Sequence, residues 1–409
     1  MKEHPTVAVI GLGYIGLPTA ATLANSGLEV IGIDVNPEIV ETINQGDIHI
    51  SEQGLDILVR AAVQRQSLRA ATQVQIADIH IIAVPTPITP DKKPDLSYVE
   101  AAAKSIASVL RPGDLVILES TVPPRTCTGV VGPLLEKLTG LRHGEDYGLA
   151  HCPERVIPGK ILHEIIYNDR IIGGTTPEAT ERTATLYRRF VKGELLLTDA
   201  TTAELCKLME NTYRDVNIAL ANELAEIADG IDVNINEAIR LANHHPRVNI
   251  HTPGIGVGGH CIPVDPWFIV HTAPEKARLL STARAINDSR PKVYAKRILA
   301  HLQTFPEGPV ALLGLSYKAD VDDIRESPAL EIVHELARVT TKTLWLVEPH
   351  IRALPAALTH LPNVMLVDEE RAFKEAAHLI MLVPHSSFKH KQGVIDVTKL
   401  SSALSEEVH

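Results

Sequence analysis

Residues 7–16 read VAVIGLGYIG. The first four residues are apolar and mostly β-branched, which predicts a strand over 6–10. The glycines that follow have the spacing GxGxxG, and they open a helical pattern that runs to about residue 26. A second apolar strand at 29–33 ends at Asp34, 18 residues after the last of these glycines. A strand, a glycine turn, a helix and a strand that ends in an acidic residue predict a βαβ unit that binds a dinucleotide.

The glycine turn suits a dinucleotide for a physical reason. It brings the pyrophosphate to the helix N-terminus, where unpaired N–H groups and the helix dipole favour an anion. Asp34 would accept hydrogen bonds from the ribose hydroxyls, and its charge would repel a 2′-phosphate. We therefore expect NAD rather than NADP as the cofactor. The residues expected to bind it here are Gly11, Gly13, Tyr14, Ile15, Gly16 and Asp34.

The composition excludes several classes of partner. The 409 residues carry a formal charge of −11, which argues against binding of nucleic acid or an acidic membrane. A charge-free run at 7–24 has the length of a membrane span, but glycines and Pro18 interrupt it, so we expect the strand and helix above instead. Four cysteines at no metal-ligand spacing predict no metal site and fit a reducing cytoplasm.

Further strands are predicted at 79–84, 115–118 and 148–151, and each ends in turn residues. Because the carboxyl ends of parallel strands meet at one edge of a sheet, polar residues just after them should face a common crevice. Each alone is equally typical of an ordinary turn or a solvated ion pair. These residues are Thr86, Thr121, Glu154 and Arg155.

A long helix is predicted from 201 to about 229, with Thr201 or Thr202 as its N-cap. A polar, cationic stripe at i, i+4 and i+7 follows one side of it, which is either a solvated face or part of a site. The stripe consists of Lys207, Asn211 and Arg214. The other side carries apolar residues typical of a core or a subunit contact, namely Leu205, Met209, Val216 and Leu220.

Residues 253–267 read PGIGVGGHCIPVDPW, a glycine-rich loop that carries Cys261 and Asp265. The glycines allow close approach of the backbone to another group. Cys261 is either a buried structural cysteine or a nucleophile. A thiol acts as a nucleophile only where a cation or a helix N-terminus stabilises the thiolate.

After a turn-rich segment at 304–309 the alternation of strands and helices resumes. Strands at 310–315, 343–347 and 379–383 predict a second, smaller parallel sheet, and the single Gly314 in its first turn indicates a ligand other than a dinucleotide. The fold class expected is α/β, with two Rossmann-like doubly wound parallel sheets joined by the long helix and a helical middle domain. The predicted domains are 1–200, 201–304 and 305–409.

These residues in this order resemble the UDP-glucose/GDP-mannose dehydrogenase family over essentially the whole chain. The motifs that carry the resemblance are residues 11–18 (GLGYIGLP), 120–122 (STV), Pro153-Glu154, 203–207 (AELCK) with Asn211, Cys261 with Asp265, and 314–318 (GLSYK) with Asp323, Arg325, Ser327 and Pro328. Within the family, residues 152–159 (CPERVIPG) and 258–270 (GGHCIPVDPWFIV) are similar to the branch that acts on UDP-N-acetyl-D-mannosamine. Arg155, Val156 and His260 depart from the UDP-glucose branch, which usually has Phe, Leu and Ser there.

The resemblance implies a four-electron oxidation of the sugar C6 hydroxymethyl group to a carboxylate, with two NAD reduced in turn. Cys261 would hold the aldehyde as a thiohemiacetal and then a thioester, and Lys207 would act as the first base or steady the oxyanion. Glu154 would be the base for hydrolysis, with Thr121 and Asp265 positioning the water and Asn211 lining the site. Thr86, Thr121 and Arg325 would add to the NAD site.

The substrate implied is a UDP-sugar, bound by residues 305–409 and by local cations. The expected substrate-binding residues are Arg155, Val156, Lys207, Asn211, Arg214, His245, Arg247, Gly258, Lys318 and Ala319. The resemblance also implies a homodimer along the long helix, in which Arg247 would serve the neighbouring subunit's site.

Three alternatives stay open at the level of the sequence. In the first alternative the chemistry is the same, but the sugar of the substrate is N-acetylglucosamine or glucose rather than N-acetylmannosamine. A two-electron enzyme of the hydroxyacid or 6-phosphogluconate type would share the first domain and a lysine on a central helix, but it would leave Cys261 without a role. A sensor that binds NAD and a sugar nucleotide without turnover would leave the whole set of reactive residues unexplained.

Overall fold

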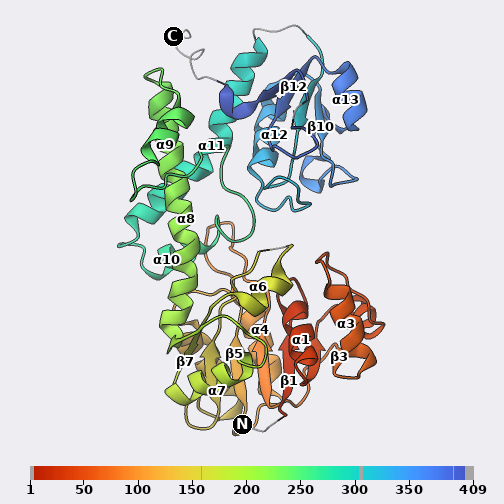
Figure 1. The fold of residues 1–409 in the computed structure, drawn as a ribbon, viewed down its shortest axis with the longest axis vertical. Coiled ribbons are helices and arrows are strands. Elements are labelled where there is room, and N and C mark those ends of the chain that lie inside the picture. Colours follow the sequence, from red (N-terminus) through yellow and green to blue (C-terminus); the bar gives the residue numbers. More distant parts are fainter. Residues whose placement is uncertain (1–3, 158, 304–306, 390, 401–409) are drawn as a thin grey trace. The chain divides into compact units, whose positions relative to one another are not determined.

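The structure is a computed structural model, and it describes residues 4–157, 159–303, 307–389 and 391–400. The chain forms two compact units, drawn with their elements in Figure 1. The first unit comprises Met1–Glu210 and Trp267–Pro274, and the second comprises Asn211–Pro266 and Glu275–His409. The division into three domains at residues 200 and 304 stays a prediction.

The first unit is built on an eight-stranded sheet in the order β3-β2-β1-β4-β5-β6-β7-β8. Its strands are β1 Thr6–Ile10, β2 Glu29–Ile33, β3 Leu68–Ala71, β4 Ile79–Ile82, β5 Leu115–Leu118, β6 Gly148–His151, β7 Arg170–Gly174 and β8 Leu195–Asp199. Strands β1 to β6 are parallel, and the sequence analysis predicted all of them except β3. The sequence did not predict that β7 pairs with β6 in the antiparallel direction and that β8 then runs parallel to β7.

Helices cover both faces of this sheet, because alternate residues of each strand point to opposite sides. Val7 and Val9 face one core with α1 and α3, whereas Ala8 and Ile10 face a second core with α4. The helices are α1 Gly16–Asn25, α2 Pro37–Asn44, α3 Leu55–Gln64, α4 Ser97–Ala107, the π-helix η1 Cys127–Val131, α5 Gly132–Thr139, α6 Ile161–Tyr167 and α7 Pro177–Tyr187.

The second sheet has five parallel strands in the order β11-β10-β9-β12-β13. Its elements are β9 Val310–Leu313, α12 Pro328–Val339, β10 Leu344–Val347, β11 Val364–Leu366, α13 Glu369–Glu375, β12 His378–Met381 and β13 Val394–Asp396, with 3-10 turns η2 Ala356–Leu358 and η3 Val397–Lys399. Two sheets of this kind confirm the predicted fold class.

The remaining helices are α8 Ala200–Asp229, α9 Ile235–Ala242, α10 Asp265–Thr272 and α11 Arg278–Gln303. In the second unit, two buried arginines of α11 pair with carboxylates of α8: Arg284 with Asp215 at 2.6 Å, and Arg290 with Glu226. None of the helices in the described part of the chain combines the length and the apolar character that a membrane crossing needs.

The start of α8 differs from the prediction. Asp199, not Thr201 or Thr202, caps it, because its carboxylate accepts hydrogen bonds from both the N–H and the hydroxyl of Thr202. One turn later, Glu204 accepts the backbone N–H groups of Arg125 and Cys127. These bonds fix the first turns of α8 to the segment after β5.

Candidate active site

The glycine turn after β1 leaves open space at the N-terminal end of α1. Gly11 has φ +91° and donates its N–H to the carbonyl of Ile33 at 2.8 Å. A Cβ on Gly16 would lie 1.7 Å from the Gly11 carbonyl oxygen, so the turn tolerates no side chain there. A Cβ on Gly13 would meet nothing within 4 Å. The open position at the N-terminal end of α1 fits the pyrophosphate of a dinucleotide.

Asp34 lies at the carboxyl end of β2, where the sequence places it. Its Oδ2 accepts the N–H of Leu12 at 3.0 Å, and its Oδ1 accepts the N–H of Asn36 at 3.0 Å. The carboxylate is therefore held against the glycine turn. Carboxylate oxygens have further lone pairs, so this position suits ribose hydroxyls as well.

Two of the predicted crevice residues are in direct contact. The hydroxyl of Thr86, after β4, donates to the carbonyl of Thr121, after β5, at 2.6 Å. The neighbouring Ser120 hydroxyl donates to the carbonyl of Val84 at 2.7 Å. The loops after β4 and β5 are thus joined at the same edge of the sheet as the glycine turn after β1.

Glu154, after β6, is a buried carboxyl group with 8% of its surface exposed. Burial raises its pKa to about 7, against the opposing charges of Arg170 and Lys207 and a hydrogen bond from the N–H of Val156 at 2.6 Å. A carboxyl group with a pKa near neutrality can both take and release a proton under physiological conditions.

Lys207 of α8 is 7% exposed. The polar stripe of this helix is therefore buried at Lys207 and is not a solvated face there. Burial and the positive charge of Lys207 lower the pKa of His151 to about 3, which keeps that imidazole neutral. Lys207 therefore belongs to the same buried polar region of the first unit as Glu154.

Arg155 is already engaged by other groups. Its Nη2 lies 2.7 Å from Glu210 Oε1, and its Nη1 donates to the carbonyl of Asp169 at 2.9 Å. The adjacent Val156 is half-buried, and its side chain packs against the core that α1 shares with the sheet. To bind a phosphate, the guanidinium would have to break its ion pair with Glu210.

In the second unit, Asp265 opens α10 and is linked to Asn211 of α8. The amide Nδ2 of Asn211 donates to Asp265 Oδ2 at 2.6 Å, and the N–H of Asp265 donates to the carbonyl of Cys261 at 2.8 Å. The structure therefore brings together three residues that the sequence grouped. The thiol-bearing Cys261 is half-buried rather than enclosed in hydrocarbon.

The glycines before the cysteine allow two backbone segments to touch. The N–H of Gly259 donates to the carbonyl of Arg325 at 3.1 Å. A Cβ on Gly258 would lie 2.6 Å from the carbonyl oxygen of Glu326. The cysteine loop is thereby attached to the loop that follows β9.

That contact brings His260 into a charged cluster that the sequence did not predict. His260 Nδ1 lies 3.7 Å from Asp323 Oδ2 and 3.3 Å from Arg325 Nη2, and Arg325 pairs with the same carboxylate at 2.7 Å. Asp323 and the thiol of Cys261 raise the pKa of His260 to about 9. Burial opposes ionisation of Asp323, but His260 and Arg325 outweigh it and hold its pKa well below the usual range. An imidazolium beside a cysteine stabilises the thiolate.

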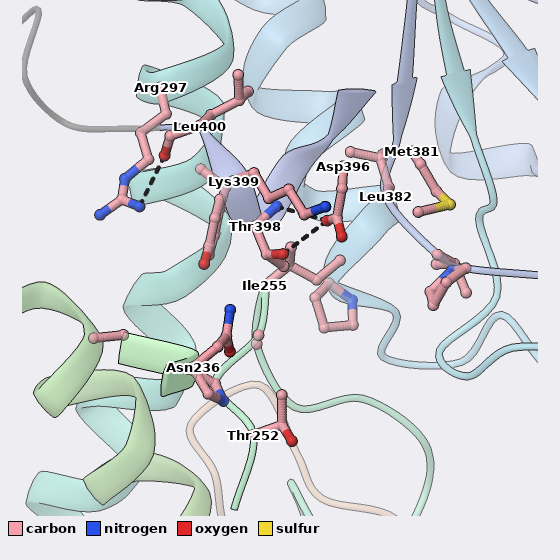
Figure 2. A pocket seen from close by; sticks show the side chains of 18 of the residues that line it. Asn236, Thr252, Ile255, Arg297, Met381, Leu382, Asp396, Thr398, Lys399 and Leu400 are labelled. Atoms are coloured by element: carbon pink, nitrogen blue, oxygen red, sulfur yellow. Dashed lines mark hydrogen bonds between the residues drawn. The ribbon is translucent and has the colours of Figure 1, made fainter. Parts of the chain in front are cut away.

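The second unit also contains a cavity of about 450 Å³, shown in Figure 2. Residues 252–256, the last turns of α8, the loop after β9 and the segment after β13 line it. Arg297 points along one side and donates to the carbonyl of Leu400 at 3.1 Å, while Asp396 accepts the hydroxyl of Thr398 at 2.7 Å. This size is in the range of small-molecule sites.

Two of the ten predicted substrate residues, Lys318 and Ala319, line this cavity, and eight do not. The predicted substrate residues that lie outside its lining are Arg155, Val156 and Lys207 of the first unit and Asn211, Arg214, His245, Arg247 and Gly258 of the second. His245 and Arg247 follow α9 on the surface, where His245 Nδ1 accepts the N–H of Arg247 at 3.3 Å.

Lys318 owes its position to a buried network that sequence reasoning missed. Glu348 accepts the N–H groups of Leu315 and Ser316, and His385 Nε2 lies 3.0 Å from the same carboxylate. The hydroxyl of Ser316 then donates to the carbonyl of Lys318 at 2.6 Å. Glu348 and His385 follow β10 and β12 along the chain, so only the folded sheet brings them together.

Comparison with known proteins assigns the family. Residues 5–191 match the NAD binding domain of the UDP-glucose/GDP-mannose dehydrogenase family, residues 201–289 match its central domain and residues 311–408 match its UDP binding domain. The chain is 52% identical over 412 residues to the NDP-N-acetyl-D-galactosaminuronic acid dehydrogenase of Ralstonia nicotianae, with 98% of this chain and 95% of that protein covered. It is 49% identical over 400 residues to the UDP-N-acetyl-D-mannosamine dehydrogenase of Campylobacter jejuni, with 96% and 98% covered.

Solved structures agree with these matches. The UDP-N-acetyl-mannosamine dehydrogenase of S. aureus superposes with a TM-score of 0.88 at 42% identity, covering 97% of this chain and 96% of that one. A UDP-glucose dehydrogenase from Pyrobaculum islandicum gives a TM-score of 0.86 at 27% identity, covering 97% and 95%. The chain therefore belongs to the UDP-glucose/GDP-mannose dehydrogenase family, and its cofactor is NAD.

Proposed function

We propose that the chain oxidises the C6 hydroxymethyl group of UDP-N-acetyl-D-mannosamine to a carboxylate, giving UDP-N-acetyl-D-mannosaminuronate. The observation that carries this proposal is the set of relatives with that substrate in their names, which cover 94–96% of the chain at 47–49% identity. Arg155, Val156 and His260 support it, because they separate this chain from the UDP-glucose branch at three positions.

A second candidate substrate is a nucleotide-linked N-acetyl-D-galactosamine. Two relatives at 51–52% identity carry the name NDP-N-acetyl-D-galactosaminuronic acid dehydrogenase. Both candidates have an N-acetyl group at C2 of the sugar. They differ in the configuration of ring carbons.

The first half of the reaction converts the alcohol into an aldehyde. When bound, NAD accepts a hydride in each of the two oxidations. Lys207 takes the hydroxyl proton or stabilises the oxyanion, since a buried ammonium group acts strongly on a developing negative charge. Asn211, one helical turn further along α8, is held by Asp265 and donates to the substrate oxygen.

The second half requires a covalent step. The thiolate of Cys261, stabilised by His260, attacks the aldehyde carbon to give a thiohemiacetal, and oxidation of that adduct gives a thioester. Glu154 then takes a proton from the water that attacks the thioester carbon, and Thr121 and Asp265 orient this water. A reducing cytoplasm would keep the thiol available for this cycle.

The nucleotide is proposed to occupy the cavity of the second unit. Residues 311–408 match the UDP binding domain of the family, and Lys318 and Ala319 of this segment line the cavity. The ammonium group of Lys318 would neutralise part of the diphosphate charge. Arg214, His245, Gly258 and the first-unit residues Arg155 and Val156 stay proposed contacts of the sugar and diphosphate.

We also propose a homodimer through the exposed side of α8. Leu205, Met209, Leu220 and Ile227 are exposed there and lie on one face of the helix, four to eleven residues apart. An apolar stripe of this kind on a surface helix indicates a protein contact. Arg247 would then contribute to the active site of the neighbouring subunit.

A panel of nucleotide sugars tests the substrate. Purified enzyme with NAD should reduce two NAD per molecule of UDP-N-acetyl-D-mannosamine, with a kcat/KM at least tenfold above those for UDP-N-acetyl-D-galactosamine, UDP-N-acetyl-D-glucosamine and UDP-glucose; a tenfold ratio corresponds to about 1.4 kcal/mol of discrimination. A preference for the galactosamine nucleotide would replace the first candidate by the second. A preference for UDP-glucose would refute both.

A further inference from the structure

A buried ion cluster lies beside Glu154 in the first unit. Arg170, the first residue of β7, is 4% exposed and lies between two carboxyl groups. Its Nη2 is 3.7 Å from Glu154 Oε1, and its Nη1 is 3.6 Å from Glu119 Oε1. Glu119 follows β5 and is 1% exposed. The ends of three strands therefore supply one guanidinium and two carboxyl groups to a buried region.

The charges of this cluster do not balance when both carboxyl groups are ionised. One guanidinium and two carboxylates carry a net charge of −1, and a buried net charge is costly. Burial therefore favours protonation of one of the two acids, whereas the nearby ammonium group of Lys207 opposes it at Glu154. The hydrogen-bond donors around each acid decide which of them holds the proton.

The donors favour an ionised Glu119. The hydroxyl of Tyr187 donates to Glu119 Oε1, and the hydroxyl of Thr19 donates to Oε2 at 3.3 Å. Glu154 receives one backbone donor, the N–H of Val156. Burial raises the pKa of both acids, but two donors stabilise a carboxylate more than one does, so Glu154 is the acid that is protonated more readily.

We propose that Glu119 and Arg170 are positioning residues for the hydrolytic step: Glu119 neutralises Arg170 permanently, and Glu154 is thereby left free to gain and lose a proton. The proposal rests on the role of Glu154 proposed above. In that step Glu154 removes a proton from water, the new C–O bond forms, the C–S bond to Cys261 breaks, and the proton later leaves Glu154 for solvent. Without Glu119, Arg170 would hold Glu154 as a permanent carboxylate.

Other charged groups act on Glu154 from the elements packed around it. Lys207 of α8 favours the carboxylate, and Glu119 opposes it. The guanidinium of Arg170 also lies 4.9 Å from the ring centre of Tyr187 and 3.7 Å from the sulfur of Cys152. Burial raises the pKa of Cys152 to about 11 and that of Tyr187 well above its usual value, so neither carries charge near neutral pH.

The isosteric change Glu119→Gln tests the proposal. It leaves Arg170 with Glu154 as its one remaining carboxylate in this cluster, so the acidic limb of the pH–rate profile should move to lower pH by about one unit. Arg170→Gln should move that limb in the opposite direction. As a matched control, Glu52→Gln changes another buried carboxyl group, which accepts the N–H groups of Gly159 and Ile161, and should leave the limb in place.

Difference infrared spectroscopy measures the carboxyl protons directly and does not depend on turnover. In the wild-type enzyme one buried carboxylic acid band should titrate between about pH 6 and 8, since a carboxyl pKa near neutrality falls in this window, and Glu154→Gln should remove it. If that band persists in Glu154→Gln, the proton belongs to Glu119 and the proposal is wrong. The proposal is also wrong if folded Glu119→Gln shows the same midpoint of the infrared titration as the wild-type enzyme. Normal turnover by Glu154→Gln would instead refute its role as the base, while the infrared titration still decides how Glu119 and Arg170 act.

Discussion

At the scale of single residues, the proposed base Glu154 also affects stability. Burial raises its pKa from 4.5 to about 7, so folding disfavours its ionised form. The stability of the fold is then unaffected by this group below its unfolded pKa and falls as pH rises from about 4.5 to 7, above which the cost stays constant. A shift of this size corresponds to about 3 kcal/mol.

We therefore expect Glu154→Gln to raise the melting temperature more at pH 8 than at pH 5. The amide is neutral at both values and still accepts the N–H of Val156, so it avoids the cost of burying the charge. Thermal unfolding of both proteins at the two pH values measures this difference. Equal changes in melting temperature at pH 5 and pH 8 would contradict the assignment of the raised pKa.

His260 gives a second prediction at this scale. Its pKa of about 9 means that the imidazolium persists at pH 7, where it stabilises the Cys261 thiolate. His260→Gln should slow alkylation of Cys261 by iodoacetamide at pH 7 by about tenfold, because the thiolate loses a cationic neighbour. The rate is read from the mass of the peptide that contains Cys261.

The matched control is His244→Gln, because His244 is an exposed histidine of the same unit. It should leave the alkylation rate unchanged. An unchanged rate in His260→Gln as well would show that His260 does not act on the thiol.

At the scale of elements, the cysteine loop depends on glycine at one position and not at another. A Cβ on Gly258 would lie 2.6 Å from the backbone oxygen of Glu326, whereas a Cβ on Gly254 would meet nothing within 4 Å. Gly258→Ala should therefore destabilise the fold by about 1–3 kcal/mol, the usual cost of overpacking. Gly254→Ala should change stability little. Urea unfolding of the two variants compares these costs, and equal stabilities would contradict the close packing of the two loops.

The exposed side of α8 is the second element that yields a prediction. Met209, 55% exposed, belongs to the apolar stripe of α8. Met209→Lys places a charge in the proposed dimer contact and should convert the dimer into a monomer in light scattering at micromolar concentration. Ile57→Lys makes a similar change on α3, where Ile57 is 68% exposed, and should leave the mass unchanged. A dimeric Met209→Lys variant would place the interface elsewhere.

At the scale of the whole molecule, local patterns predicted the two sheets because their signals lie close together in the sequence. The strand before Gly11 and the acid at Asp34 belong to one βαβ unit, so periodicity and turn residues suffice to find them. The reversed direction of β7 has no such signal, since an apolar strand reads alike in both directions.

The candidate site was predictable only in part, because only some of its residues lie in motifs that are local in the sequence. Cys261, Lys207 and Glu154 belong to recognisable motifs, as do Asn211 and Asp265, which the structure shows hydrogen-bonded to each other. Residues that act on them through space, such as Asp323 on His260 and Glu119 through Arg170, are separated from them by tens of residues along the chain. Their chemistry depends on contacts that form only in the folded protein.

The stoichiometry of NAD reduction tests the central claim that one chain performs both oxidations through Cys261. Wild-type enzyme with limiting UDP-N-acetyl-D-mannosamine should form two NADH per sugar and release the uronate without free aldehyde, whereas Cys261→Ser should form no uronate. One NADH per sugar with release of the aldehyde, or normal uronate formation by Cys261→Ser, would contradict the covalent four-electron mechanism.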